Sequence, residues 1–225
     1  MEEQRIPHVR KTIYTTVVKR LLDILLSGAA LIVLSPVFLV ITILELIYHG
    51  RPVLFTQERP GKDEKLFKVY KFRSMTNETD ENGVLLPNEK RLTKFGKKLR
   101  RLSLDELPEL FCIFTGKMSI IGPRPLRPQY LQYYTERHHY RHAVRPGLMV
   151  YPLKPRKSWT WNDQFENDIW YVENCSFSVD IRMVYIVLKN AVSGGETRAD
   201  AIRKRLTEDY WREDKVEESI SVRSS

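Results

Sequence analysis

The sequence predicts an α/β fold, mostly helical with a small β-hairpin or sheet, in a monotopic membrane protein. Three observations lead to this prediction. Residues 24 to 44, ILLSGAALIVLSPVFLVITIL, carry no formal charge over 21 positions, which is long enough to enter a bilayer. Two strand-like segments follow, and from residue 91 onward apolar residues recur mainly at helical spacing.

Composition points to an anionic partner. The 225 residues include 37 Lys and Arg against 28 Asp and Glu, a net charge of +9, and 42% of the chain is hydrophobic, enough for a core. Such an excess suits nucleic acid, a phosphorylated metabolite or an anionic membrane surface. Cys112 and Cys175 match no zinc spacing and no disulfide framework, so we expect packing roles in a reducing compartment.

The uncharged segment is predicted to be a re-entrant helix. A signal peptide would end at a small-residue cleavage site, whereas apolar residues here run on to Leu44, and an apolar helix of this length is rare inside a small soluble domain. Basic residues flank both ends, so a straight span would place one group on the wrong side. Ser35 and Pro36 lie in the middle, where proline removes a helical hydrogen bond and the serine hydroxyl can bond the freed carbonyl. A helix that enters and leaves by the cytoplasmic face is favoured, and a straight spanning helix remains the alternative.

The segments after it alternate between strands and helices. We predict strands at VLFTQ and KLFKVYKF around a turn at RPGKDE, then a polar loop over residues 76 to 90. Residues 91 to 102 form a basic amphipathic helix suited to a membrane surface. Helices are also predicted at 107 to 114, 127 to 144 and 178 to 192, the last capped by Ser178. This divides the chain into an N-terminal segment with the membrane helix (1–50), a cytoplasmic domain (51–192) and a charged C-terminal helix and tail (193–225).

The stretch LSLDELPEL, residues 102 to 110, places two carboxylates after a basic run. In a structural interpretation Asp105 caps a helix that holds Pro108 in its first turn; a start at Ser103 would push Pro108 deeper and is less favoured. In a functional interpretation the helix N-terminus keeps Asp105 ionised as a nucleophile or metal ligand. Mg²⁺ between Asp105 and Glu106 would relieve their repulsion.

Cations in stiff settings accompany the carboxylates. Arg124 lies between two prolines in GPRP, Arg145 begins RPG, Lys71 and Arg73 lie at a strand end in KFRSM, and Arg100 belongs to the basic run. Fixed guanidinium groups suit phosphate. The set indicates a site for a phosphorylated anhydride.

In this order, the LSP-containing apolar segment, PVLFTQERPG, KFRSM, RLTKFGKKLRRLSLDELPEL, GKMSIIGPRP and RPG resemble the bacterial sugar transferase family, the monotopic phosphoglycosyl transferases, in their minimal form. The resemblance covers roughly residues 17 to 190. It implies that Asp105, with Glu106 as its partner and Mg²⁺ on the diphosphate, attacks the β-phosphate of a UDP-sugar and expels UMP. Polyprenyl (undecaprenyl) phosphate then accepts the phosphosugar.

The same resemblance implies a setting and a set of binding residues. Lys71, Arg73, Arg100, Arg124 and Arg145 would bind substrate, and the enzyme would work at the cytoplasmic face of the bacterial inner membrane, in the first membrane step of glycoconjugate or exopolysaccharide synthesis. The chain departs from the family pattern at Lys117, near Gln129 and after RPG, where LMVYPLKPRKSWTW replaces a Gly-rich stretch. The donor sugar and a homodimer are left open.

Two other functions are compatible with parts of the sequence. A glycosyltransferase that moves sugar without phosphate would need a DxD motif, which the chain lacks. A non-enzymatic basic module on the membrane could bind anionic lipid or nucleic acid, but no nucleic-acid motif is present and we expect no such partner. The Tyr and His residues between 130 and 142 fit an interfacial amphipathic helix better than a metal site, and Trp159 and Trp161 fit packing.

Overall fold

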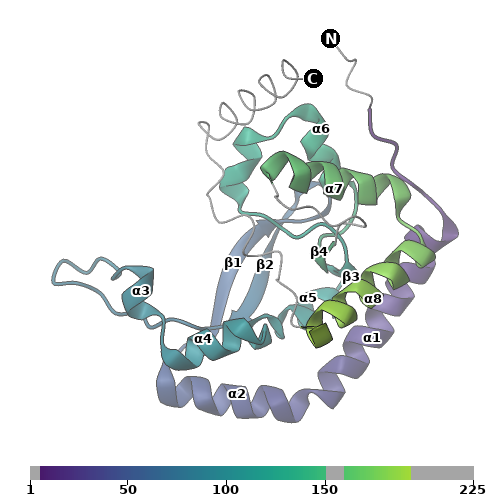
Figure 1. The fold of residues 1–225 in the computed structure, drawn as a ribbon. Helices are drawn as coiled ribbons and strands as arrows, with labels where there is room; N and C mark the ends of the chain where they lie inside the picture. The colour runs from purple at the N-terminus through teal and green to yellow at the C-terminus, as the bar shows by residue number, and fades with distance from the viewer. Residues whose placement is uncertain (1–5, 151–159, 194–225) are drawn as a thin grey trace.

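A computed structural model describes residues 6–150 and 160–193 of the chain (Figure 1). The fold is mostly helical with two small sheets, as predicted. In chain order the elements are η1 Tyr14–Val18, α1 Lys19–Val33, α2 Ser35–Tyr48, β1 Leu54–Pro60, η2 Lys62–Glu64, β2 Leu66–Phe72, α3 Asn88–Arg91, α4 Lys94–Arg101, η3 Leu104–Glu106, α5 Glu109–Phe114, β3 Ser119–Ile121, η4 Pro128–Tyr133, α6 Glu136–His139, η5 Tyr140–Ala143, β4 Gly147–Met149, α7 Trp161–Asn174 and α8 Phe177–Ser193.

The apolar segment is broken where the sequence predicts. The helices on either side of Leu34 are bent by 60°, Pro36 lies in the first turn of α2, and Ser35 Oγ donates to the Ile32 carbonyl at 2.7 Å. Among the described residues no single helix has both the length and the apolar composition to cross a bilayer, whereas the bent pair Tyr14–Val33 and Ser35–Tyr48 meets both criteria together.

Helices α1 and α2 turn polar side chains inward and apolar ones outward. Asp23, Ser27 and Glu45 are buried. Exposed side chains on the same helices include Leu21, Leu25, Leu26, Ile32, Val33, Leu39, Val40, Ile43 and Ile47. A continuous apolar surface of this kind marks an interaction site rather than a face made for water.

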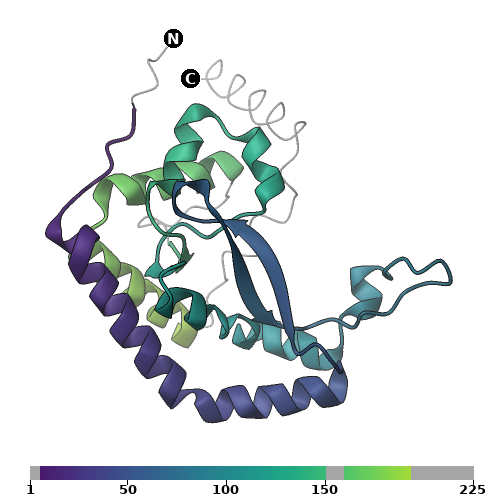
Figure 2. The ribbon, with the colours of Figure 1, turned by 180° about the vertical axis from the view of Figure 1, so that it is seen from behind.

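Polar contacts of Lys19, Arg20 and Asp23 join α1 to the rest of the molecule, and Lys19 pairs with Asp180 of α8. Asp23 Oδ1 accepts from Ser119 Oγ at 3.1 Å and from the Ile120 amide at 3.0 Å. The Arg20 guanidinium donates to the carbonyls of Ile113 and Phe114 at the C-terminus of α5, where helix carbonyls lack partners within the helix. Figure 2 shows α1 and α2 from behind, running along one edge of the molecule.

The predicted hairpin is confirmed as the antiparallel pair β1 and β2, in a register that pairs Phe55 with Lys71 and Arg59 with Phe67. Phe67 and Val69 are buried against Cys112, Ile113 and Met118. Because side chains alternate across a strand, Lys71 lies on the same face as Phe67 and Val69. The apolar face of the hairpin therefore ends at a half-buried cation beside α5, where Lys71 Nζ lies 3.1 Å from Glu109 Oε1.

Strands β3 and β4 pair in parallel and bring the GPRP and RPG turns together. A Cβ on Gly147 would lie 2.2 Å from the Gly122 amide nitrogen, and a Cβ on Gly122 would lie 2.6 Å from the Arg145 carbonyl oxygen. Only glycine permits this approach of two backbones. The turns that carry Arg124 and Arg145 are therefore neighbours.

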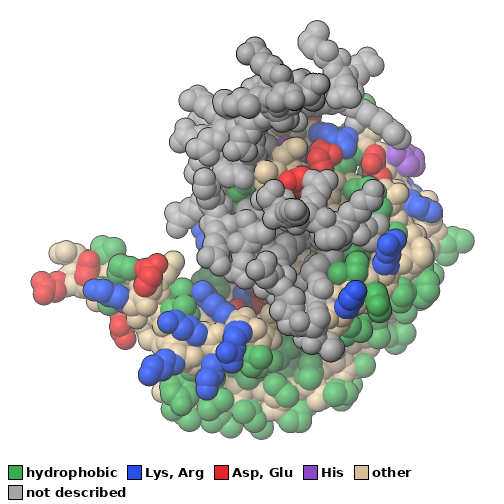
Figure 3. Space-filling view, in the orientation of Figure 1, with side chains coloured by type: hydrophobic (Ala, Val, Ile, Leu, Met, Phe, Trp, Pro, Cys, Tyr) green, Lys and Arg blue, Asp and Glu red, His purple; other side chains and the backbone are tan. Residues whose placement is uncertain are grey.

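The basic helix predicted over 91 to 102 is confirmed with a later start, as α4, capped by Thr93, whose hydroxyl accepts from the Gly96 amide. Figure 3 shows Lys and Arg side chains gathered over α4, beside the hydrophobic surface over α2. The juxtaposition suits an anionic, lipid-bearing surface.

Three helix predictions need correction. The helix that follows Asp105 begins only at Glu109, and Asp105 lies in the separate 3₁₀ turn η3 without capping it. Residues 127 to 144 form three short helices instead of one, because Tyr134 is extended and Thr135 starts a new helix through a capping box with His138. Helix α8 begins at Phe177, so Ser178 is not its cap.

The aromatic side chains of this segment form a core rather than an interfacial helix. Tyr130, Tyr133 and Tyr134 pack against Trp161 and Phe165 of α7. The packing role predicted for Trp161 is confirmed. Trp159 and the predicted C-terminal helix and tail lie outside the described residues.

Candidate active site

The two carboxylates are fixed by the leucines around them. Ser103 adopts a left-handed conformation (φ 53°), after which Leu104 to Glu106 form the turn η3. Leu104 and Leu107 pack against the cluster of Ile41, Phe72 and Leu99. Burial of the apolar side chains on either side holds Asp105 and Glu106 between α4 and α5.

Glu106 is neutralised by two cations. Its Oε1 lies 2.6 Å from Lys71 Nζ and also pairs with Arg124 Nη2. Burial raises the pKa of Glu106, but the charges and hydrogen bonds of Arg124 and Lys71 outweigh it and lower that pKa to about 2. Glu106 is therefore ionised at every physiological pH.

Asp105 is in a different state, although it is the next residue. Burial and the Glu106 charge raise the pKa of Asp105, while Lys71 and Arg100 oppose the shift. Among the described residues no side chain forms an ion pair or hydrogen bond with its carboxylate. The helix N-terminus that was expected to keep Asp105 ionised is absent, since α5 starts four residues later. The carboxylate is available for reaction.

Three of the five predicted substrate-binding residues lie at this cluster. Lys71 and Arg124 bind Glu106. Arg100 donates from Nε to Ser74 Oγ at 2.8 Å, and its charge acts on the pKa of Asp105. These three cations therefore lie around the carboxylate pair.

The other two cations are held elsewhere. Arg73 is buried, and its guanidinium donates to the carbonyls of Pro52 and Met75 at 2.9 and 3.4 Å. Arg145 donates from Nε to the Gly116 carbonyl at 3.1 Å, and its charge acts on Arg20. In the structure both act on backbone carbonyls rather than on the carboxylate pair.

Three charged residues near the carboxylate pair were not predicted as site residues from the sequence: Glu109, Arg59 and Arg127. Glu109 is buried, with Oε1 3.1 Å from Lys71 Nζ, and burial raises its pKa. Burial and the charges of Arg127 and Arg124 lower the pKa of Arg59 to about 10, opposed by the charge of Glu109, and Arg127 precedes η4, which packs on the strand of Arg59. Arg59 and Glu109 belong to the motifs QERPG and DELPEL, but only tertiary structure brings them to the site: the register of β1 with β2 for Arg59, and the packing of α5 on β2 for Glu109.

The carboxylates of the site could provide only part of the coordination shell of Mg²⁺. The described residues contain no group of three or more His, Cys, Asp or Glu side chains arranged to hold a metal ion. Mg²⁺ commonly takes one or two carboxylates and completes its shell with water and substrate phosphate. Because Glu106 is already paired with two cations, Asp105 is the carboxylate open to such an ion.

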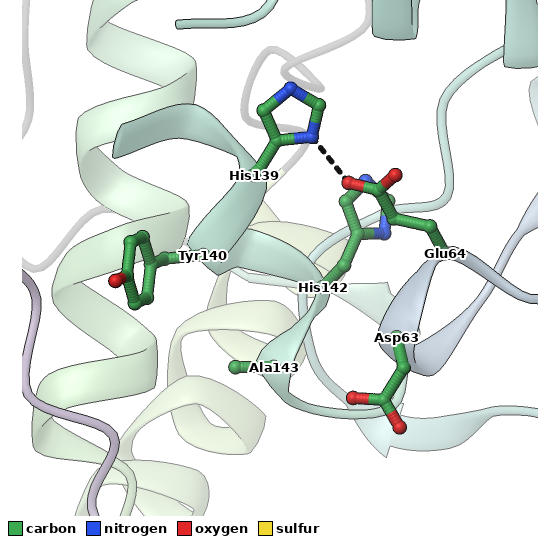
Figure 4. Close-up of a pocket in the computed structure, with 6 residues that line it drawn as sticks. All are labelled: Asp63, Glu64, His139, Tyr140, His142 and Ala143. Atoms are coloured by element: carbon green, nitrogen blue, oxygen red, sulfur yellow. Dashed lines mark hydrogen bonds and ion pairs between the residues drawn. The ribbon is translucent and has the colours of Figure 1, made fainter. Parts of the chain in front are cut away.

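A separate hollow of about 350 Å³ lies at the turn of the hairpin (Figure 4). His139 and Glu64 form an ion pair on its wall, and His142 Nδ1 is 3.0 Å from the Gly61 carbonyl. Lys71 is at the opposite end of the same hairpin. The hollow is therefore not part of the carboxylate site.

Two bacterial proteins are similar to this chain over most of their length. The uncharacterized sugar transferase EpsL of Bacillus subtilis (strain 168) is 41% identical over 177 residues, 78% of this chain and 88% of the relative. The exopolysaccharide production protein PSS of Rhizobium leguminosarum bv. phaseoli is 36% identical over 198 residues, 80% of this chain and 98% of the relative.

A longer relative carries a more specific name. The UDP-glucose:undecaprenyl-phosphate glucose-1-phosphate transferase of Escherichia coli (strain K12) is 35% identical over 181 residues, which are 76% of this chain but only 39% of the relative. The chain thus spans about two-fifths of that enzyme. The family model for bacterial sugar transferases matches residues 14–194. The chain belongs to the bacterial sugar transferase family.

Proposed function

We propose that this protein is a polyprenyl-phosphate sugar-1-phosphate transferase, which moves a phosphosugar from a UDP-sugar to polyprenyl (undecaprenyl) phosphate. Relatives named undecaprenyl-phosphate sugar phosphotransferases support the reaction class. The observation that carries the proposal is the asymmetry of the carboxylates: Glu106 is neutralised by Lys71 and Arg124, whereas Asp105 carries no ion pair among the described residues.

In the first step an Asp105 carboxylate oxygen attacks the β-phosphorus of the donor. The bond from this phosphorus to the bridging oxygen breaks, and its electron pair leaves with UMP. Asp105 then carries the phosphosugar as an acyl phosphate. In the second step an oxygen of the lipid phosphate attacks the same phosphorus, and the carboxylate of Asp105 is released.

The surrounding cations make the first step possible. An ionised carboxylate and a diphosphate repel each other, and fixed positive charges offset this repulsion most strongly where water is largely excluded. Lys71 and Arg124 hold Glu106 in place, so its charge does not add to the repulsion, and Arg100 acts directly on Asp105. Mg²⁺, held by Asp105 and the donor phosphates, would supply further neutralisation.

The exposed apolar side chains of α1 and α2 support a membrane location for this chemistry. We propose that α1 and α2 form a re-entrant pair whose exposed apolar side chains enter the cytoplasmic leaflet of the bacterial inner membrane. The basic helix α4 lies beside them (Figure 3), where it would contact anionic lipid. The lipid acceptor and the water-soluble donor would meet at this boundary, in the first membrane step of glycoconjugate or exopolysaccharide synthesis.

Intact-protein mass spectrometry tests the proposal. Detergent-purified protein is incubated with Mg²⁺ and a panel of UDP-sugars without acceptor, and Asp105→Asn is compared with Asp63→Asn. Asp63 is a matched control because it lies at the hairpin turn with φ 53°, a conformation that Asn adopts readily. We expect a phosphosugar adduct and UMP release from the wild type and Asp63→Asn, and neither from Asp105→Asn. If no UDP-sugar forms an adduct or releases UMP, the protein is instead a non-enzymatic membrane module.

A further inference from the structure

Positive charge exceeds negative charge around the carboxylates. Lys71, Arg100 and Arg124 lie at Asp105, Glu106 and Glu109. Arg59 is on the same face of the hairpin as Lys71, and Arg127 directly precedes η4, which packs on β1. Lys71 pairs with both glutamates, and Arg124 pairs with Glu106. The described part of the chain provides no ion pair for Arg59 or Arg127. Within residues 6–150 and 160–193, Arg59 Nη2 donates to Gln57 Oε1 at 2.7 Å.

Two unmatched guanidinium groups beside a third repel one another. The turn η4, which Arg127 directly precedes, packs on β1, the strand that carries Arg59. Burial and the charges of Arg127 and Arg124 lower the pKa of Arg59 to about 10, although the charge of Glu109 opposes the shift. A fold gains nothing from holding these charges together. An anion with several oxygens, such as phosphate, would turn the repulsion into attraction.

The three arginines are mounted on rigid backbone. Arg59 lies in a paired strand, opposite Phe67. Arg127 precedes η4, which begins at Pro128. The Arg124 carbonyl accepts from Arg141 Nη2 at 2.7 Å, and Arg141 is fixed in turn by the buried Asp168. Preformed guanidinium groups lose little entropy when they bind an anion.

The position of Arg59 indicates which phosphate the group would bind. Arg59 is four residues along β1 from Phe55, the partner of Lys71, a distance of about 13 Å along the strand. Figure 1 shows the hairpin running from α2 and α4 toward α6 and α7. Arg59 therefore lies on the side of Lys71 that is remote from the apolar helices, the side from which a water-soluble nucleotide would approach.

We propose that Arg59 and Arg127, together with Arg124, form a second phosphate subsite, which binds the phosphate that stays on the nucleotide. The inference rests on the proposed function. When the bond to the bridging oxygen breaks, its electron pair and the new negative charge remain on this phosphate. Arg59 and Arg127 stabilise that charge, and so they bind UMP as the leaving group while Lys71, Arg100 and Arg124 act at the phosphorus under attack.

Direct binding of UMP tests the subsite without catalysis. Isothermal titration calorimetry with UMP and with inorganic pyrophosphate compares the wild type, Arg59→Gln, Arg127→Gln and Lys68→Gln in detergent. Lys68 is the matched control because it is exposed on the opposite face of the hairpin. We expect Kd for UMP to rise at least about tenfold in Arg59→Gln and in Arg127→Gln, since each loses a charged hydrogen-bond donor, and to stay unchanged in Lys68→Gln.

Further arms separate the alternatives. Arg59→Lys keeps the charge and the fold, and we expect it to retain most of the UMP affinity that Arg59→Gln loses. Binding of a short-chain polyprenyl phosphate should be the same in all variants; if it weakens while UMP binding does not, the subsite belongs to the lipid and the proposal is wrong. Unchanged UMP affinity in both Gln variants also overturns it. If Asp105→Asn forms the adduct as the wild type does, the proposed nucleophile fails, but an Arg-dependent UMP affinity would still support the subsite.

Discussion

Two clusters of charge lie on either side of the GPRP turn, and they are built differently. At the front, Arg124 pairs with Glu106; behind, the Arg124 carbonyl accepts from Arg141, which pairs with Asp168. The Arg141 and Asp168 side chains are 1% and 0% exposed, whereas those of Arg124 and Glu106 are 52% and 22% exposed. One turn thus joins a sealed ion pair to an open one.

The sealed cluster is fully matched. Asp168 Oδ2 accepts from Arg141 at 2.7 and 3.1 Å, and Oδ1 accepts from Gln164 Nε2 at 2.9 Å. Buried charges are tolerated only when every group has a partner. The open cluster instead leaves Asp105, Arg59 and Arg127 without an ion pair in the described ranges. The difference indicates that the rear cluster maintains the fold, and the unpaired groups of the front cluster are those that the proposed function assigns to the substrate.

The largest expected effect is on stability, at the rear. Asp168→Asn leaves the Arg141 charge buried without its counter-ion, which should lower the free energy of unfolding by about 3 to 5 kcal/mol. Chemical denaturation of the detergent-solubilised protein measures the change. The double variant Arg141→Met with Asp168→Leu removes both charges and should recover most of the loss. A loss in the double variant as large as in Asp168→Asn would show that shape, rather than charge, dominates this cluster.

Glu106→Gln should have little effect on stability and a large effect on the reaction rate. The ion pairs of Glu106 are partly exposed, so the free energy of unfolding should change by less than about 1 kcal/mol. The rate of UMP release should fall at least about 100-fold, because Lys71 and Arg124 lose the carboxylate that positions them. Initial rates and melting curves of the same preparation report both quantities. If melting falls as far as in Asp168→Asn, the front cluster is structural and the comparison fails.

The pH dependence should follow Asp105. Its pKa is raised by burial and by Glu106, and the ionised form is the nucleophile, so the rate of adduct formation should decline as pH falls through the raised value. Glu106 remains ionised in this range, since its pKa is about 2. Because its pKa is lower in the folded than in the unfolded protein, its ion pairs stabilise the fold fully above the ordinary carboxylate pKa. This stabilisation is lost as pH falls from the ordinary value through the pKa of about 2.

The Glu106→Gln variant sharpens this test. With the neighbouring charge removed, the pKa of Asp105 should fall, so the acid limb of the rate profile should move to lower pH. Rapid-quench mass spectrometry over a pH series measures the limb in both proteins. A limb that stays in place in Glu106→Gln would show that the charge of Glu106 does not act on the titrating group.

Local patterns in the sequence were enough for the elements with a clear period. The alternation in KLFKVYKF predicted β2, the helical spacing of Phe95 and Leu99 predicted α4, and the Ser35-Pro36 pair predicted the break between α1 and α2. The single helix predicted over residues 127 to 144 is wrong, because aromatic residues at this spacing are compatible with either one interfacial helix or a packed core. Their packing on α7, which no local pattern reveals, favours the core.

The site was predicted in part for the same reason. The rigid backbone at the strand end and in the GPRP turn predicts Lys71 and Arg124 as site residues, and the basic run beside the dyad predicts Arg100. Arg73 and Arg145 have similar local settings, but their guanidinium groups donate to backbone carbonyls that only tertiary contacts bring near. Arg59 and Glu109 reach the cluster through strand register and helix packing, which sequence spacing does not encode.

The smallest expected effect comes from an ion pair on the same helix as Asp168. Glu166 accepts from Arg137 Nε and Nη2, each at 2.9 Å, but its side chain is 39% exposed. Glu166→Gln should therefore change the free energy of unfolding by less than about 1 kcal/mol, although the substitution has the same chemistry as Asp168→Asn two residues later. Parallel denaturation curves compare the two. An equal loss of unfolding free energy in the two variants would mean that burial does not determine how much an ion pair stabilises this protein. The contrast between the two sides of the GPRP turn would then depend on the unpaired groups alone.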